Sequence, residues 1–204
     1  MNLQSYTLFL QGDVQVGKST IIHNALRSYE QNVCGLMVQR LFENDQKCGF
    51  RACIVDGKLP DLEAQYAKNI SGIFLYKKQA FPQVLEQAIG RTLELCVKKH
   101  CQIIVLDEIG GLELLSKPFM TALHKILQLK KPCLGVIKSL ENLAHTARRV
   151  HLPATILELG IQLQQELQSS GEILIVDPKN RHKTADMVQN FIEKVLLEGD
   201  RSQR

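Results

Sequence analysis

Near the amino end of the chain, two glycines, a lysine and a serine follow one another at a spacing that suits phosphate binding. The pattern is G-x-x-x-x-G-K-[S/T], formed by Gly12, Asp13, Val14, Gln15, Val16, Gly17, Lys18 and Ser19, with Thr20 next. Small residues allow the backbone to wrap around phosphates, so that successive amide groups and a helix amino terminus face the anion. We expect Lys18 to bridge the β- and γ-phosphate oxygens and the Ser19 hydroxyl to bind Mg²⁺.

Position 15 departs from the common form of such a loop. Many of these loops have a glycine there, because glycine adopts positive φ angles at no steric cost. This chain has Gln15 instead. We therefore expect either a slightly strained loop or a side chain that reaches the γ-phosphate or its attacking water.

A second candidate lies at the end of an apolar run in the middle of the chain. The apolar residues from Ile103 to Leu106 precede two carboxylates, Asp107 and Glu108. A carboxylate at the end of a buried strand can hold Mg²⁺, usually through its water shell, and we assign this role to Asp107. Glu108 is placed to act as general base for an attacking water. With the loop upstream, the adjacent glutamate favours hydrolysis over transfer to a bound acceptor.

These motifs need elements that hold them in place. Residues 6–10 are predicted to form a short buried strand, and residues 18–29 an amphipathic helix. Residues 35–42 and 47–55 are predicted as an antiparallel hairpin across a short polar turn. Residues 56–72 show little periodicity, so we interpret them as a loop.

Farther along the chain, buried strands alternate with amphipathic helices. Strands are predicted at 102–107, 132–137 and 172–176 and helices at 81–99, 117–129 and 187–196, whereas 154–168 fits either type. This alternation favours an α/β fold of three layers, with a mostly parallel sheet, helices on both faces and the antiparallel hairpin. We expect residues 1–204 to form a single domain.

Composition excludes several classes of protein. The 204 residues are 45% hydrophobic and 23% charged, which argues against disorder, and no apolar run approaches the roughly 20 residues that span a bilayer. No secretion signal is visible at the amino end, so we expect a cytoplasmic protein with no membrane partner. The net charge of +4 arises from scattered basic pairs with few aromatics, which disfavours nucleic acid as a partner.

The cysteines and histidines could suggest a disulfide framework or a metal site. The six cysteines contain no Cys-x-x-Cys pair and lie mostly among apolar neighbours, and the six histidines are isolated in the sequence. We therefore interpret the cysteines as small core residues and predict no metal-ligand set from these two residue types.

Recognition of the nucleotide base is the least defined part of the site. The Asn-Lys-x-Asp signature of a GTPase is absent from the sequence, so no strict guanine reader is expected. Tyr66, Tyr76 and Phe81 could stack on a base, although packing in the core or a loop explains them better. Arg148 and Arg149 could stabilise transition-state charge from a lid, but a solvated helix face is the favoured interpretation.

With these motifs in place, the sequence resembles the small nucleoside-triphosphatase family, P-loop proteins of similar length that include the cancer-related and thermophilic nucleoside-triphosphatases. Four segments carry the resemblance: Gly12 to Thr20, Gly35 with the later Lys47-Cys48-Gly49-Phe50, Asp107-Glu108-Ile109-Gly110 with Leu112-Glu113-Leu114, and Asn180-Arg181. Together they cover nearly the whole chain.

The resemblance implies a P-loop NTPase fold and Mg²⁺-dependent hydrolysis of ATP, GTP, CTP and UTP to diphosphate and phosphate, with little base selectivity. Three departures bear on rate and substrate preference. Met37-Val38-Gln39 replaces the usual Thr-Glu, Gly111 stands where Lys is common, and Gln15 replaces the loop glycine.

Two other functions fit the same motifs. A P-loop kinase would phosphorylate a nucleoside or small metabolite, with an acceptor pocket at 56–72 and Arg148 and Arg149 on a lid. A slow nucleotide-controlled module would present a conformational change to an unidentified protein partner. Hydrolysis with Lys18 and Glu108 as catalytic residues is the leading prediction, because the adjacent glutamate suits water as acceptor.

Overall fold

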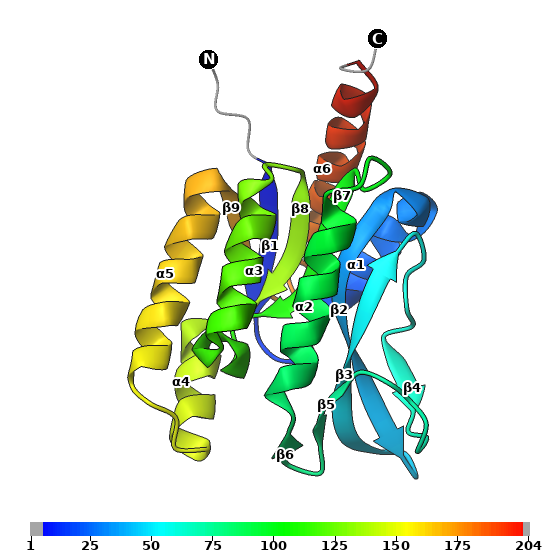
Figure 1. Cartoon of the computed structure of the whole chain (residues 1–204). Coiled ribbons are helices and arrows are strands. Elements are labelled where there is room, and N and C mark those ends of the chain that lie inside the picture. Colours follow the sequence, from blue (N-terminus) through cyan, green and yellow to red (C-terminus); the bar gives the residue numbers. More distant parts are fainter. Residues whose placement is uncertain (1–5, 202–204) are drawn as a thin grey trace.

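The apolar runs of the sequence pair into one mixed sheet in the computed structural model, which describes residues 6–201 (Figure 1). Its strands are β1 (Thr7–Gly12), β2 (Val33–Glu43), β3 (Gln46–Asp56), β4 (Glu63–Gln65), β5 (Ile73–Tyr76), β6 (Gln79–Ala80), β7 (Ile103–Ile109), β8 (Cys133–Ile137) and β9 (Gly171–Val176). The strand order is β6-β5-β3-β2-β7-β8-β1-β9, and β4 pairs with β2 off this path.

Five neighbouring strands, β2, β7, β8, β1 and β9, run parallel to one another. Their register places Leu10, Val136, Asp107 and Met37 side by side in one row across the sheet. Because parallel strands end at the same edge, the carboxyl ends of β1 and β7 lie close together there. This edge therefore brings the end of the first strand to the Asp107-Glu108 pair.

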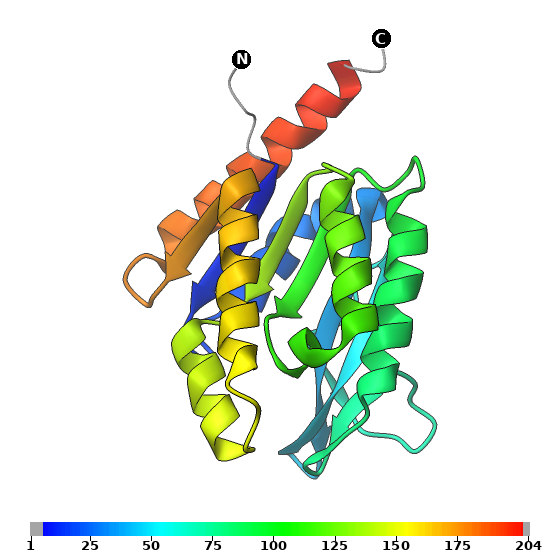
Figure 2. The same ribbon diagram turned by 60° about the vertical axis from the view of Figure 1, so that its left-hand side comes forward.

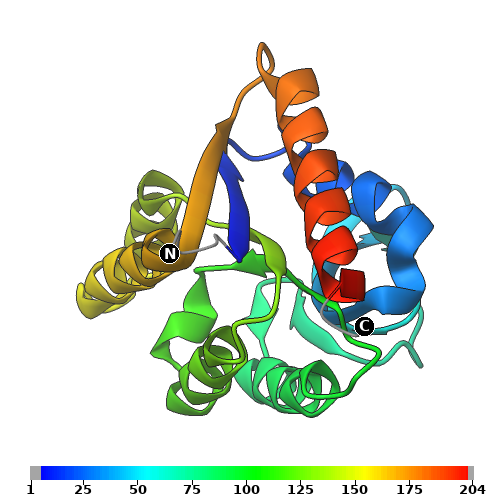
Figure 3. The ribbon, with the colours of Figure 1, turned by 90° about the horizontal axis from the view of Figure 1, so that it is seen from above.

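Helices cover both faces of this sheet, as the sequence predicted (Figures 2 and 3). They are α1 (Lys18–Leu26), α2 (Pro82–Cys96), α3 (Lys117–Gln128), α4 (Leu140–Arg149), α5 (Thr155–Ser170) and α6 (Arg181–Arg201), with 3₁₀ turns at Arg27–Asn32 and Leu112–Leu115. In the view from above, α1 and α6 lie on one side of the strands, and α2, α3 and α5 lie on the other. The fold is thus a three-layer α/β arrangement.

The alternation of side chains along each strand divides the interior into two cores. Phe9 packs on the side of α2, α3 and α5, whereas its neighbours Leu8 and Leu10 pack on the side of α1 and α6. In β7, Ile104 and Val105 divide in the same way. Strands buried on both faces need apolar residues at successive positions, which explains the uninterrupted apolar run before Asp107.

The antiparallel hairpin of β2 and β3 is confirmed, with Met37 opposite Cys53. Asn44 and Asp45 turn the chain with φ angles of 51° and 59°, as a tight hairpin turn requires. The uncertain stretch 154–168 is helical, because α5 buries Leu163 and Leu167 on one face.

Several expectations about the elements need correction. The first helix ends at Leu26 and not at residue 29, the last helix begins at Arg181 and not at residue 187, and α4 was not predicted. Residues 56–72 are not wholly a loop, since β4 pairs with the outer part of β2 beyond the end of β7. The short strands β5 and β6 were missed, and they extend the sheet beyond β3. The second helix ends at Cys96, so residues 97–99 belong to the connection that follows it.

Two further findings concern the whole chain. Among residues 6–201, no helix is long and apolar enough to cross a membrane. The cytoplasmic location stays a prediction. All six cysteines are free and five of them are buried, in line with their interpretation as core residues.

Candidate active site

The predicted phosphate loop connects β1 to α1 at the carboxyl edge of the sheet. Gly12 ends β1 with a φ of 149°, and a side chain there would collide with the carbonyl oxygen of Val176 in β9. Gln15 has a φ of 66° and Gly17 a φ of 97°. The glutamine thus adopts the left-handed conformation that glycine adopts at lower cost, which agrees with the expected strain.

Lys18 is the first residue of α1, and its side chain folds back over the loop. Its Nζ donates hydrogen bonds to the carbonyl oxygens of Gly12 at 2.9 Å and Asp13 at 2.6 Å. Burial lowers the pKa of Lys18, and the nearby carboxylates of Glu108 and Asp107 oppose that effect. The ammonium group therefore lies between the loop and the two predicted acidic residues.

Ser19 joins the loop to the central strand. Its hydroxyl donates a hydrogen bond to Oδ1 of Asp107 over 3.1 Å. The two residues are far apart in sequence, and the parallel register of β1, β8 and β7 brings them together. The structure thus assembles the two predicted metal-binding residues in one place.

Asp107 is a buried carboxylate with incomplete hydrogen bonding. The residue is 2% exposed, and its Oδ2 has no hydrogen-bond partner among the described residues. Burial raises its pKa to about 7, and the Ser19 hydroxyl only partly opposes this. An unpartnered carboxylate oxygen beside a hydroxyl is a donor set that a hard divalent cation prefers, so these residues fit such an ion.

Glu108 differs from its neighbour because its side chain is exposed. Its charge nevertheless acts on Lys18, where it raises the pKa more than Asp107 does. A solvent-accessible carboxylate close to the phosphate loop can accept a proton from water.

Arg181 contacts the phosphate loop, and sequence reasoning did not assign it a role. A side-chain carbon added to Gly17 would lie 2.9 Å from its Cζ, so the guanidinium group covers this glycine. A turn at Asp177 positions Arg181 at the start of α6. In this turn, Oδ1 of Asp177 accepts hydrogen bonds from the amides of Lys179 and Asn180. The only signal in the sequence is the late Asn180-Arg181 pair.

Gln39, one of the departures within the first hairpin strand, has a structural contact. The residue is 3% exposed, and its Nε2 donates a hydrogen bond to the carbonyl oxygen of Asp61 at 2.5 Å. Its Oε1 has no partner among the described residues. Gln39 therefore holds the connection after β3 against the strand that neighbours Asp107.

The turn after β7 is held by a half-buried acid, Glu113. Gly110 has a φ of 95°, and Oε1 of Glu113 accepts a hydrogen bond from the Gly111 amide at 2.7 Å. Burial raises the pKa of Glu113, while the backbone hydrogen bonds oppose the effect. The glycine at position 111 leaves room for this carboxylate.

Other candidate residues are not brought to the loop. Tyr66 and Tyr76 stack on each other with ring centroids 4.5 Å apart, and Phe81 immediately precedes α2. Arg148 and Arg149 are exposed at the end of α4 and form no hydrogen bond or ion pair with the phosphate loop in the described part of the chain. The packing and solvated-face interpretations of these residues are thus favoured.

Comparisons with known proteins agree with this architecture. A sequence model of the NTPase family matches residues 7–189. The nucleoside-triphosphatase THEP1 of Pyrococcus abyssi is 29% identical over 136 residues, which cover 63% of this chain and 72% of that protein. THEP1 of Aquifex aeolicus is 23% identical over 193 residues, or 92% and 99% of the two chains. The crystal structure of THEP1 from A. aeolicus superposes with a TM-score of 0.54 and 19% identity, over 89% of this chain and 96% of that one.

Proposed function

This chain belongs to the NTPase family of enzymes, and from that membership we propose that it hydrolyses nucleoside triphosphates to the diphosphate and phosphate. The observation that carries the proposal is the meeting of Lys18, Ser19 and Asp107 at the phosphate loop. A buried, unsatisfied carboxylate is costly in a protein interior, and it is retained most readily where it has a chemical task.

The loop residues from Gly12 to Thr20 would bind the phosphates. The backbone amides at the start of α1 point toward an anion placed at the loop, and the helix dipole favours negative charge there. Lys18 would exchange its bonds to the carbonyls of Gly12 and Asp13 for bonds to the β- and γ-phosphate oxygens. Binding therefore requires a local rearrangement of this side chain.

Ser19 and Asp107 would hold Mg²⁺. The hydroxyl and the carboxylate are 3.1 Å apart, and the free Oδ2 of Asp107 offers a further oxygen. A Mg²⁺ ion held by these residues would supply positive charge to offset the negative charge of phosphoryl transfer. The protein residues supply the oxygen donors, and the positive charge offsets the burial cost of the Asp107 carboxylate.

Glu108 would accept the proton of the attacking water. Its carboxylate is exposed, so water reaches it, and its effect on the pKa of Lys18 indicates that it lies near the phosphate-binding ammonium group. A positioned general base contributes typically 10²- to 10⁴-fold to a reaction rate.

Arg181 would stabilise charge on the transferred phosphoryl group. Its guanidinium group lies against Gly17, inside the loop that binds the phosphates. Arginine supplied within the chain serves this purpose in phosphoryl transfer. This assignment replaces Arg148 and Arg149 as the source of a catalytic arginine.

Low base selectivity is part of the proposal. The sequence lacks the guanine-reading signature, and Tyr66 and Tyr76 are occupied with each other. We infer that ATP, GTP, CTP and UTP all serve as substrates. Membership of the NTPase family disfavours the kinase alternative.

Phosphate release from the four nucleoside triphosphates, with and without Mg²⁺, tests this proposal. Metal-dependent release from several nucleotides by the wild type, and none by Lys18→Ala, is the expected result. Equal release by Lys18→Ala would assign the activity to a contaminant. Tight binding without release would favour the slow regulatory module, and transfer of phosphate to a metabolite would favour the kinase.

A further inference from the structure

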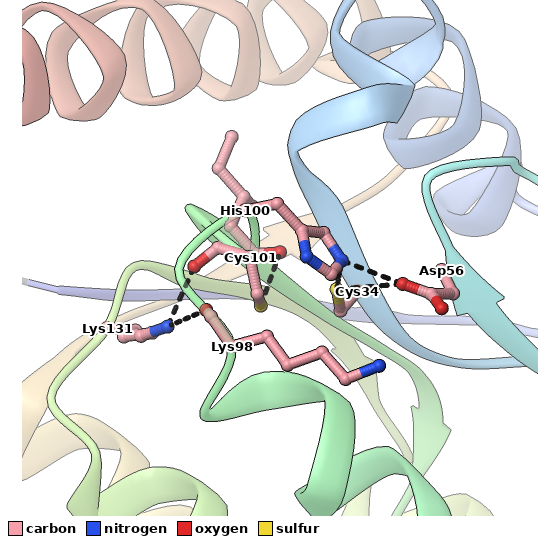
Figure 4. Close-up of polar contacts among 7 residues, drawn as sticks. Cys34, Asp56, Lys98, His100, Cys101 and Lys131 are labelled. Carbon is pink, nitrogen blue, oxygen red and sulfur yellow. Dashed lines mark hydrogen bonds and ion pairs between the residues drawn. The ribbon is translucent and has the colours of Figure 1, made fainter.

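Three side chains with metal-binding atoms converge at the opposite edge of the sheet from the phosphate loop (Figure 4). Cys34 lies near the start of β2, Asp56 is the last residue of β3, and His100 lies in the connection between α2 and β7. Sequence spacing does not indicate this group, because Cys34 and His100 are 22 and 44 positions from Asp56, which follows no metal-binding motif. Only strand pairing brings the three residues together.

The backbone fixes the positions of all three residues. Cys34 and Asp56 are direct partners in the antiparallel ladder of β2 and β3, so their side chains leave the sheet on the same face. Hydrogen bonds to the start of β2 hold the other segments, since the Gly57 amide donates to Val33 and the Gln102 amide donates to Asn32. The group is therefore part of the folded framework.

A lysine that precedes β8 also holds the connection that contains His100. Lys131 lies just before β8, and its Nζ donates hydrogen bonds of 2.9 Å to the carbonyl oxygens of Lys98 and Cys101. These two carbonyls flank His100 in sequence. The imidazole is thus presented from a connection whose backbone is tied down on both sides.

The contacts converge on one nitrogen of the imidazole. Nε2 of His100 lies 3.3 Å from Sγ of Cys34 and 2.7 Å from Oδ1 of Asp56, and the sulfur and this oxygen are 3.8 Å apart. In a catalytic relay, one ring nitrogen faces the nucleophile and the other faces the acid. Here the thiol and the carboxylate both contact Nε2 and also face each other. Three donor atoms that face one another in this way are arranged like the ligands of one metal ion.

The distances between the three atoms suit a small tetrahedral ion. Ligand atoms about 2.0–2.3 Å from Zn²⁺ lie about 3.3–3.6 Å from one another in tetrahedral geometry. The observed distances of 2.7, 3.3 and 3.8 Å bracket this range. Small movements of side chains are sufficient to admit the ion.

We propose that Cys34, Asp56 and His100 form a binding site for one Zn²⁺ ion. A sulfur, a nitrogen and a carboxylate oxygen are donors that Zn²⁺ accepts together, whereas Mg²⁺ and Ca²⁺ prefer oxygen alone. Cys34 is buried, while the side chains of His100 and Asp56 are 44% and 46% exposed. Solvent thus reaches the site from one side, and water completes the fourth position.

A bound ion would tie β2, β3 and the α2–β7 connection together. Ile103 at the start of β7 is four residue steps, or roughly 13 Å of strand, from Asp107 at the phosphate site. The Zn²⁺ site is therefore distinct from the phosphate site, and the inference does not rest on the proposed hydrolysis. Its expected effect is a gain in thermal stability, because the ion binds the folded chain and not the separated segments.

Titration of the reduced, chelator-treated full chain with Co²⁺, without nucleotide, tests this site. We expect one Co²⁺ per chain, with thiolate-to-metal charge-transfer absorption, and displacement by Zn²⁺. The phosphate site cannot give this signal, because Ser19 and Asp107 offer only oxygen donors. Replacement of a ligand in His100→Gln or Cys34→Ser is expected to weaken Co²⁺ binding more than tenfold, since even outer partners of a metal site contribute roughly 10- to 100-fold.

Cys48→Ser is the matched control, because Cys48 is a half-buried thiol on β3 that bonds to the carbonyl oxygen of Leu41. It should leave the charge-transfer signal and the affinity unchanged. His100→Gln alters an exposed side chain and remains decisive even if Cys34→Ser fails to fold. Zn²⁺ should raise the Tm of the wild type and of Cys48→Ser but not that of His100→Gln. Absence of the Co²⁺ signal in the wild type, or equal affinity in His100→Gln, would overturn the proposal.

Discussion

At the scale of single residues, Asp107 shows how burial and chemistry oppose each other. Its carboxylate is 2% exposed, and burial raises its pKa to about 7. One carboxylate oxygen accepts a hydrogen bond from the Ser19 hydroxyl, and the other has no hydrogen-bond partner among the described residues. The folded chain without a cation therefore carries a destabilising group, which is a common property of functional sites. A cation bound between Ser19 and Asp107 would remove this cost.

Arg181→Ala is predicted to lower the rate of hydrolysis strongly. The guanidinium group covers Gly17 in the phosphate loop, and loss of one charge-stabilising donor typically costs about 10²-fold in kcat. Steady-state kinetics should show the effect mainly in kcat, with a smaller change in KM. Arg148→Ala serves as control, because this arginine of α4 is exposed and forms no hydrogen bond or ion pair with the loop among the described residues. Equal rates for the two variants would remove Arg181 from the mechanism.

Glu113 gives a prediction about stability and pH. Its pKa is raised above the ordinary value of 4.5, mainly by burial. The native state thus favours the protonated acid. The contribution of Glu113 to the free energy of unfolding is fully present below its pKa in the unfolded chain, and it is lost as the pH rises through its pKa in the folded chain. Glu113→Gln has no such titration, so the stability of the wild type should fall relative to this variant as the pH rises above the ordinary pKa of 4.5.

Urea denaturation of both proteins at several pH values measures this difference. A free-energy difference of unfolding that stays constant over the whole pH range would contradict the assignment of a raised pKa to Glu113. Glu172→Gln is a suitable control, because Glu172 is exposed at the start of β9.

Residue roles were predictable where the motif is contiguous. Lys18 and Ser19 belong to one short pattern, and Asp107 and Glu108 follow one apolar strand. Arg181 was not predictable in this way, because its contact with Gly17 depends on the position of α6 relative to β1. The contacts of the Cys34 group depend likewise on strand register. Pairing across long sequence separations is not encoded in local spacing.

At the scale of elements, periodicity predicted the long helices and the buried strands, but not the short strands at the edge. β4 and β6 have three and two residues, too few for an alternating pattern. β4 forms because β2 extends beyond β7 and offers unpaired backbone groups, and β6 forms along the outer edge of β5, which itself pairs with β3. Tertiary pairing therefore determines these strands.

Gly35 and Gly90 test how closely the elements pack. A side chain at Gly35 in β2 would collide with the carbonyl oxygen of Val105 in β7, whereas nothing lies within 4 Å of one at Gly90 in α2. Gly35→Ala should destabilise the protein by about 1–3 kcal/mol or more. Gly90→Ala should stabilise it by roughly 0.5–1 kcal/mol, because alanine favours the helix. Thermal or urea unfolding measures the change in stability of both variants. Similar destabilisation by Gly35→Ala and Gly90→Ala would contradict the predicted difference in packing at the two glycines.

At the scale of the whole molecule, the two ends of the fold meet at the phosphate loop. Gly12 packs against Val176 at the end of β9, and Gly17 packs against Arg181 at the start of α6. Figure 3 shows α6 beside α1, the helix that follows the loop. The three-layer α/β class was predictable from the alternation of strands and helices. The involvement of α6 in the site was not, because its own sequence indicates only an amphipathic helix.

Nucleotide binding should therefore stabilise the whole fold. A non-hydrolysable ATP analogue with Mg²⁺ at about 100 times its Kd should add about 2.7 kcal/mol to the free energy of unfolding. The Lys18→Ala variant should lose most of this stabilisation, because it lacks the ammonium group that contacts the phosphate loop in the wild type. Thermal shift measurements on both proteins test this. An equal shift in Lys18→Ala would place the nucleotide elsewhere.

In the proposed hydrolysis of nucleoside triphosphates at this site, Glu108 is the base for the attacking water. The most direct test compares Glu108→Gln with the wild type, measuring phosphate release and nucleotide affinity on the same preparations. Because the exposed carboxylate lies beside the binding groups and is not one of them, the variant should bind Mg²⁺ and nucleotide with unchanged affinity. Its turnover should fall at least about tenfold. Turnover equal to that of the wild type would contradict the claim.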